Sequence, residues 1–187
     1  MIRKALLLLP AAVFCLAAAH APKAPPARPA AKAAPAPAAG APFDATNPQG
    51  LMGVLDSAGA KVQTSKREGD AVFVAVTSAA ANFSMQFAGC NDQGRACKAV
   101  LLDSALDKTS KDGAAVRLDQ INAFNQTSVL CRIYQAKDGA PHVIYSTLLA
   151  PGATRADGQS QMFAWQGCLA DARDFIRDPV SYLANAA

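Results

Sequence analysis

Two neighbouring stretches, AVFVAVT at residues 71–77 and NFSMQFA at residues 82–88, decide how this chain folds. Side chains of a β-strand alternate between the two faces of its sheet, so an apolar residue at every second position predicts a strand with one buried face. Both stretches have this period of two. The residues that we expect to face the core are Val72, Val74, Val76, Phe83, Met85 and Phe87.

Working outward from this pair, turn residues separate it from further strands. Gly69-Asp70 precedes the first stretch, and Gly94 lies in the connection that follows the second. Near the C-terminal end, Asp138-Gly139 is a strong signal for a β-hairpin. The additional predicted strands are residues 61–66, 98–102, 129–135 and 142–149.

Three other stretches have the period of an amphipathic helix. Asn47 and Pro48 suit the cap and the first position of a helix that ends before Gly59, and residues 116–126 form a second helix. The resulting order, α-β-β-β-β-α-β-β-α, predicts an α+β fold in which helices pack on an antiparallel sheet. The last helix has the clearest pattern, with apolar residues in steps of three and four at Met162, Trp165, Leu169, Ala172 and Ile176.

The N-terminal part has a different composition. Arg3 and Lys4 precede an apolar run at residues 5–16, and small residues follow it, which is typical of a secretory signal peptide. Cleavage after Ala19 is favoured over cleavage after Ala21. The run is too short to span a bilayer, so we expect no stable membrane insertion after cleavage. An Ala/Pro-rich stretch that favours an extended linker follows. The predicted parts are a signal peptide at residues 1–19, a linker at residues 20–42 and a folded domain at residues 43–187.

Charge argues against a nucleic-acid partner. The chain has 18 Lys and Arg against 14 Asp and Glu, and a formal net charge of +4. Five of the basic residues and none of the acidic ones precede residue 43, which leaves 13 basic against 14 acidic residues in the domain. A balanced surface of this kind lacks the concentrated positive charge that phosphate neutralisation requires.

The chain offers few residues for catalysis. His142 is the only histidine after residue 20, and we expect it to be an ordinary turn residue. G-x-S-x-G, a phosphate-binding glycine loop and H-E-x-x-H are absent from the sequence. Two carboxylate pairs, Asp103 with Asp107 and Asp171 with Asp174, are the remaining candidates, and the second pair interleaves with arginines as in a solvated helix surface. We therefore expect no enzyme and no cofactor.

Several short motifs together resemble the YbjN domain family: FAGC at residues 87–90, INAFN at 121–125, RIY at 132–134 and DGAP at 138–141. The resemblance covers nearly all of residues 47–183. It implies a fold similar to that of type III secretion chaperones, a role as a regulator of sensory transduction, and no accepted catalytic residues. The motif residues to which it assigns structural roles are Gly89, Asn122, Phe124, Asn125, Asp138 and Gly139.

Two positions depart from the family pattern. Phe124 occupies a position where many members have Trp, and Cys168 is an additional cysteine in the last helix.

Asn122 and Asn125 are three residues apart and therefore lie on one side of a helix. They either clamp a polar ligand or hydrogen-bond backbone groups of the following strand or loop, and we favour the second interpretation.

Four cysteines follow the predicted signal peptide. An even number of cysteines in an exported chain favours disulfides, and four allow three pairings. Cys90 and Cys97 flank a turn between two predicted strands, which favours pairing them and leaves Cys131 with Cys168. The alternative is a zinc site, but the spacings lack the close Cys-x-x-Cys pairs that such sites use, so we expect no metal.

These observations support three hypotheses. The first is a non-enzymatic binding or regulatory module in the bacterial periplasm or secreted medium, which docks an unidentified protein through an exposed apolar surface or a sheet edge. The fold implied by the resemblance commonly pairs, so a homodimer is part of this hypothesis. The second is a small-molecule sensor with a cavity between sheet and helices. The third is a hydrolase that uses a carboxylate pair.

Overall fold

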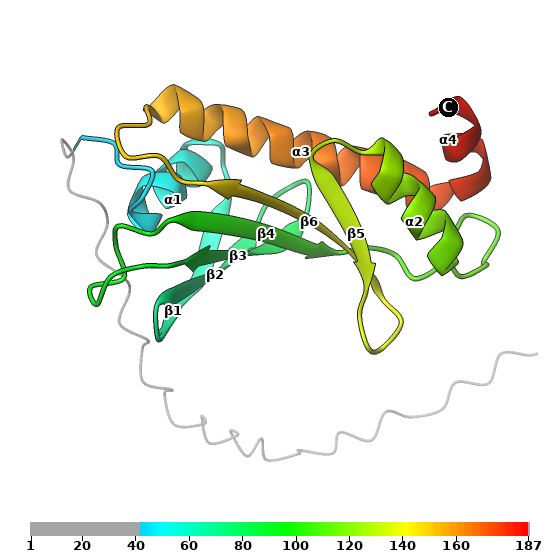
Figure 1. Ribbon diagram of the computed structural model, residues 1–187, viewed down its shortest axis with the longest axis horizontal. Helices are drawn as coiled ribbons and strands as arrows, with labels where there is room; N and C mark the ends of the chain where they lie inside the picture. Colours follow the sequence, from blue (N-terminus) through cyan, green and yellow to red (C-terminus); the bar gives the residue numbers. More distant parts are fainter. Residues whose placement is uncertain (1–41, 187) are drawn as a thin grey trace, which may run out of the picture. The chain divides into compact units, whose positions relative to one another are not determined.

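A computed structural model describes residues 42–186 (Figure 1). The predicted signal peptide and nearly all of the predicted linker lie outside the described residues. Helices and an antiparallel sheet are both present, so the predicted α+β class is confirmed. In chain order the elements are α1 (Pro48–Ser57), β1 (Lys61–Glu68), β2 (Ala71–Thr77), β3 (Asn82–Ala88), β4 (Ala99–Ala105), α2 (Leu118–Thr127), β5 (Cys131–Gln135), β6 (Pro141–Leu148), α3 (Arg155–Arg177) and α4 (Pro179–Asn185).

The six strands form one sheet in the order β1-β2-β3-β4-β6-β5, with every neighbouring pair antiparallel. The chain leaves the sheet after β4, forms α2, and returns through the β5–β6 hairpin, which brings β6 next to β4. Strands β1 and β5 are therefore the two edges of the sheet.

The helices cover one face of this sheet, and the long helix α3 runs across it (Figure 1). The predicted period of two places the large apolar residues of β2 and β3 on the covered face, where they are buried. In residues 42–186 no helix covers the other face, on which Phe73, Gln86 and Leu101 lie in one cross-strand row.

Two groups of aromatic side chains anchor the helices. Trp165 of α3 is 2% exposed and packs against Phe83 of β3, with ring centroids 5.5 Å apart. Phe124 of α2 is fully buried, with its ring centroid 4.9 Å from that of Phe175 and 5.7 Å from that of Tyr182. Phe124 thereby joins α2 to both C-terminal helices.

Helix α1 approaches α3 closely at a glycine. A β-carbon at Gly158 would lie 2.8 Å from Cζ of Phe43 and 3.2 Å from Cδ2 of Leu51. Any larger residue at Gly158 would therefore push these two side chains out of contact with α3.

The C-terminal region contains one more helix than the sequence predicted. Asp178-Pro179 ends α3, as expected, but the same two residues also begin α4. The side chain of Asp178 accepts a hydrogen bond from Ser181 N at 3.2 Å, and Pro179 occupies the first turn. An N-cap aspartate followed by proline favours a helix start, so this pair marks both the end of α3 and the beginning of α4.

The prediction of a strand at residues 129–135 is wrong for its first two residues. Strand β5 begins at Cys131, because α2 continues to Thr127 and the connection then turns outward. The Ser128 hydroxyl accepts a hydrogen bond from Cys131 N at 3.2 Å, which holds this turn. Val129 and Leu130 consequently project from the connection instead of pairing in the sheet.

In the part of the chain that the structure describes, no helix is both long and apolar enough to cross a membrane.

Candidate functional site

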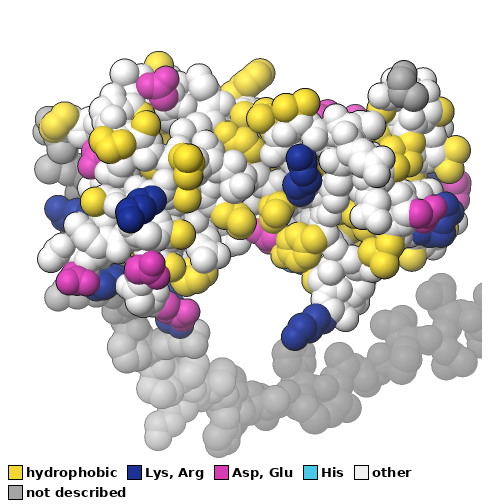
Figure 2. Space-filling model, in the orientation of Figure 1, with side chains coloured by type: hydrophobic (Ala, Val, Ile, Leu, Met, Phe, Trp, Pro, Cys, Tyr) yellow, Lys and Arg dark blue, Asp and Glu magenta, His cyan; other side chains and the backbone are white. Residues whose placement is uncertain are grey.

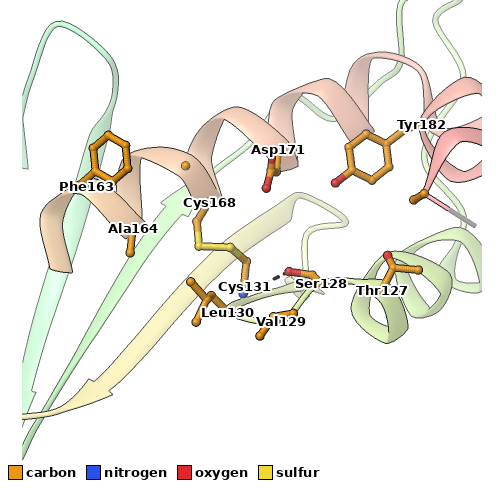
Figure 3. Close-up of a pocket in the computed structure, with 12 residues that line it drawn as sticks. Thr127, Ser128, Val129, Leu130, Cys131, Phe163, Ala164, Cys168, Asp171 and Tyr182 are labelled. Carbon is orange, nitrogen blue, oxygen red and sulfur yellow. Dashed lines mark hydrogen bonds between the residues drawn. A yellow bond between two sulfur atoms is a disulfide. The ribbon is translucent and has the colours of Figure 1, made fainter. Parts of the chain in front are cut away.

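A groove of about 420 Å³ lies between α3, α4 and the connection from α2 to β5 (Figure 3). The connection contributes Val129 and Leu130 to its wall, and α3 contributes Phe163 and Ala164. Tyr182 of α4 closes one end. Most of the lining is therefore apolar.

Three of these apolar side chains are unusually exposed. Val129 is 87% exposed, Leu130 is 56% exposed and Phe163 is 78% exposed. Hydrophobic side chains also gather across the middle of the face in Figure 2, where α3, β6 and β5 lie in Figure 1. Adjacent exposed apolar residues around a hollow are typical of interaction sites, whereas single exposed ones are common on any protein surface.

A disulfide forms part of the groove. Cys131, the first residue of β5, is bonded to Cys168 of α3, with Cα atoms 5.6 Å apart (Figure 3). This bond joins the two walls covalently. The second disulfide joins Cys90 to Cys97 across the loop between β3 and β4. These are the two pairs that the sequence favoured.

The groove has one polar end. The Asp171 carboxylate and the Tyr182 hydroxyl are turned toward the same space (Figure 3). Burial, and then the negative charges of Asp171 and Asp174, raise the pKa of Tyr182, so its hydroxyl stays protonated. Asp174 forms an ion pair with Arg177 at 2.8 Å, which agrees with the prediction that these carboxylates lie on a solvated helix surface with arginines between them. Asp171 has no ion-pair partner within residues 42–186.

Asn125 blocks the edge of the sheet beside the groove. Its side-chain amide donates to Ile133 O at 2.9 Å and accepts from Ile133 N at 2.8 Å. These are the outward-pointing backbone groups at the centre of β5, so the amide takes the place of a neighbouring strand. Asn125 therefore has the structural role that the sequence favoured. Asn122 is exposed and makes no side-chain hydrogen bond to any described residue.

Replacing Asn125 by alanine tests this role. The substitution leaves both backbone groups of Ile133 without their partner in a half-buried site, and we expect the free energy of unfolding to fall by about 1–3 kcal/mol. Asn122→Ala, three residues earlier on the same helix, is the matched control and should change it by less than about 0.5 kcal/mol. Urea denaturation of both variants measures the difference; equal losses would contradict the role of Asn125.

Asp103, Tyr134 and His142 form a polar cluster on the uncovered face of the sheet. Asp103 accepts a hydrogen bond from the Tyr134 hydroxyl at 2.9 Å, and its other oxygen lies 2.9 Å from His142 Nδ1. The Tyr134 and His142 rings stack with centroids 5.1 Å apart. Burial and the bond to Asp103 raise the pKa of Tyr134 to about 12. Both oxygens of Asp103 are thus engaged, and neither bonds to Asp107.

Asp103 holds the His142 ring in one orientation, which explains why a histidine is accommodated at the start of β6. No group of three or more His, Cys, Asp or Glu residues positioned to hold a metal ion occurs within the described residues.

The remaining motif residues form turns. Gly89 and Gly139 have positive φ angles of 64° and 80°, which favour glycine. Asp138 accepts from Ala140 N at 3.1 Å and pairs with Lys108 at 3.1 Å, which lowers the pKa of its carboxyl group. The Asp-Gly pair lies in the predicted hairpin, which joins β5 to β6.

The exposed groove residues were not predicted as a site from the sequence. The sequence predicts Val129 and Leu130 as part of a strand at residues 129–135. Phe163 directly follows the core residue Met162, so it lies outside the apolar stripe of α3, and this was the one available signal: a large aromatic residue on the polar side of an amphipathic helix.

No protein-family model matches this chain, and no curated protein or solved structure matches it. The fold and the groove define an α+β domain with an apolar surface site. The resemblance to the YbjN family stays a prediction.

Proposed function

We propose that this chain is a non-enzymatic, exported protein-binding module of the YbjN type, and that the groove between α3, α4 and the α2–β5 connection is its docking site. The observation that carries the proposal is the exposure of Val129, Leu130 and Phe163 around one hollow. Keeping these side chains in water costs free energy that a bound partner would recover.

The geometry favours one mode of docking. Strand addition at β5 is opposed by Asn125, which already bonds the central backbone groups of that edge. The groove instead presents side chains, as in proteins that hold an amphipathic segment by its apolar face. The disulfide across its floor fixes the two walls before binding, which lowers the entropic cost of association.

Charge complementarity defines the chemistry of the occupant. Asp171 is the only charged residue that lines the groove, and no cation in residues 42–186 pairs with it. A partner segment that carries aliphatic side chains and one Lys or Arg would fill the apolar walls and neutralise this carboxylate. We therefore infer that the occupant is such a segment of a different protein.

Other observations support the remaining parts of the proposal. Two disulfides are characteristic of oxidising compartments, which agrees with export. The groove is open along the surface, whereas small-molecule sites usually enclose most of their ligand, so the sensor hypothesis is less well supported. The carboxylate-pair hypothesis loses its best candidate, because Tyr134 and His142 engage Asp103.

Site-specific photocrosslinking in intact cells tests the proposal. We expect a photoreactive residue at Leu130 or Phe163 to form a crosslink to one partner protein, and the crosslinked peptide to contain aliphatic residues and a Lys or Arg. The same residue at Leu148, which is 79% exposed on the uncovered sheet face, is the matched control and should not form it. With the probe at Leu130, Asp171→Lys should suppress the crosslink, and Phe163→Ala should weaken the isolated complex roughly tenfold.

Two outcomes would overturn the proposal. A crosslink between two copies of this chain would identify the groove as a dimer interface. A crosslink that forms equally well at Leu148, or that survives Asp171→Lys unchanged, would show that the groove does not select the partner.

A further inference from the structure

A second pocket, of about 300 Å³, lies between the start of α1, strand β1 and the loop between β3 and β4. The buried residues Pro48 and Val72 contribute an apolar floor. The rim is polar and has two cationic side chains but no acidic one: it consists mainly of Gln49, Ser65, Arg67, Gln93 and Arg95.

Arg67 is held in place without being neutralised. Its Nε donates to Gly69 O at 3.0 Å, and its Nη1 donates to Asp92 O. Both acceptors are backbone carbonyls, so the guanidinium keeps its positive charge and its orientation is fixed. Asp92 contributes its carbonyl oxygen, and its carboxylate forms no ion pair with Arg67 in the described part of the chain.

The Cys90–Cys97 disulfide closes the loop that carries Arg95. Within this loop, Asn91 Oδ1 accepts from Gln93 N at 3.1 Å and from Arg95 N at 2.9 Å, and Asn91 N donates to Arg95 O at 2.7 Å. The backbone is therefore fixed at Gln93 and Arg95, whose side chains line the pocket. The Arg95 guanidinium itself makes no hydrogen bond or ion pair to residues 42–186.

The donors of this pocket are side chains and not the end of α1. Asn47 already accepts hydrogen bonds from Gln49 N at 3.2 Å and Gly50 N at 2.8 Å, so these N–H groups are satisfied. The donors left free by the described residues are the Arg95 guanidinium and the remaining N–H groups of Arg67, with neighbouring amide and hydroxyl donors.

We propose that this pocket binds a doubly charged oxyanion, such as the phosphate group of a small organic ester. Two guanidinium charges match a dianion better than a single carboxylate, and the planar fork of Arg bonds phosphate oxygens in pairs. Ser65, Gln49 and Gln93 can donate to the remaining oxygens. The apolar floor at Val72 accommodates the organic part. This site is separate from the apolar groove and does not depend on its function.

Isothermal titration of the mature chain with inorganic phosphate, at constant ionic strength and without reductant, tests the site. We expect one phosphate per chain and weaker binding of acetate. Arg95→Gln removes one charge without disturbing a contact of the fold, and we expect the dissociation constant to rise roughly tenfold or more. Lys61→Gln, which removes an exposed cation of β1 outside the pocket, is the matched control and should leave the constant within roughly twofold.

Arg67→Gln should weaken binding as well, but it also removes two contacts of the fold, so Arg95→Gln is the decisive variant. A wild-type chain that does not bind phosphate would overturn the proposal. Equal losses in Arg95→Gln and Lys61→Gln, or equal affinity for phosphate and acetate, would also overturn it, because binding would then reflect general charge attraction.

Discussion

Replacing Cys131 and Cys168 together by alanine is expected to lower the free energy of unfolding by about 4 kcal/mol. The two cysteines are 37 residues apart, and a disulfide that closes a loop of this length removes much of the conformational entropy of the unfolded chain. The loss is large relative to the total stability of a small domain. Urea denaturation without reductant, followed by the fluorescence of the single tryptophan, measures it.

The other disulfide provides the comparison. Cys90 and Cys97 are only 7 residues apart, so their double alanine variant should lose about 2.5 kcal/mol on the same loop-entropy basis. All four cysteines are buried, which makes the two variants comparable in packing. If removing the disulfide of the short loop lowers the free energy of unfolding as much as removing that of the long loop, loop closure is not the source of the stabilisation.

Trp165→Ala should have an effect of similar size, with a loss of about 3–5 kcal/mol. Trp165 is 2% exposed between α3 and the sheet, and its removal leaves a cavity against Phe83 that the surrounding helices and strands cannot fill. Thermal or urea denaturation followed by circular dichroism is the suitable measurement, because the variant has no tryptophan.

Phe163→Ala is the matched control for this substitution. It removes an aromatic side chain from the same helix, two residues away, but Phe163 is 78% exposed, so the free energy of unfolding should change by less than about 0.5 kcal/mol. Trp165→Phe should cost much less than Trp165→Ala, since the indole N–H has no hydrogen-bond partner in residues 42–186. A stable Trp165→Ala variant would contradict the assignment of this residue to the core.

The spacing of apolar residues in the sequence was sufficient to predict most of the fold. The alternation in β2 and β3 and the steps of three and four in α3 predicted which residues are buried, because local geometry fixes the face on which each side chain lies. The Cys90–Cys97 pair and the hairpin at Asp138-Gly139 were predictable for the same reason, since both are local in the chain.

Sites that depend on long-range topology could not be predicted in this way. Asp103, Tyr134 and His142 meet only because β6 returns beside β4 with β5 outside it. The apolar groove requires α4, which was not predicted from the sequence. It also requires an outward turn at Val129, where the apolar residues Val129 and Leu130 instead suggested the start of a strand. The arginine pocket joins Arg67 and Arg95 from separate elements, and overall charge gave no indication of it.

The blocked margin at β5 has a consequence for self-association. Asn125 closes one side of the sheet, so within residues 42–186 only β1 is left with an unpaired outer row of backbone groups, and Lys61 and Arg67 along it repel an identical copy. If two molecules did join along β1, the outer margins of the combined sheet would be the two β5 strands, and Asn125 blocks each of them. A third molecule would find no strand to extend, and stacking into fibres would stop at two chains.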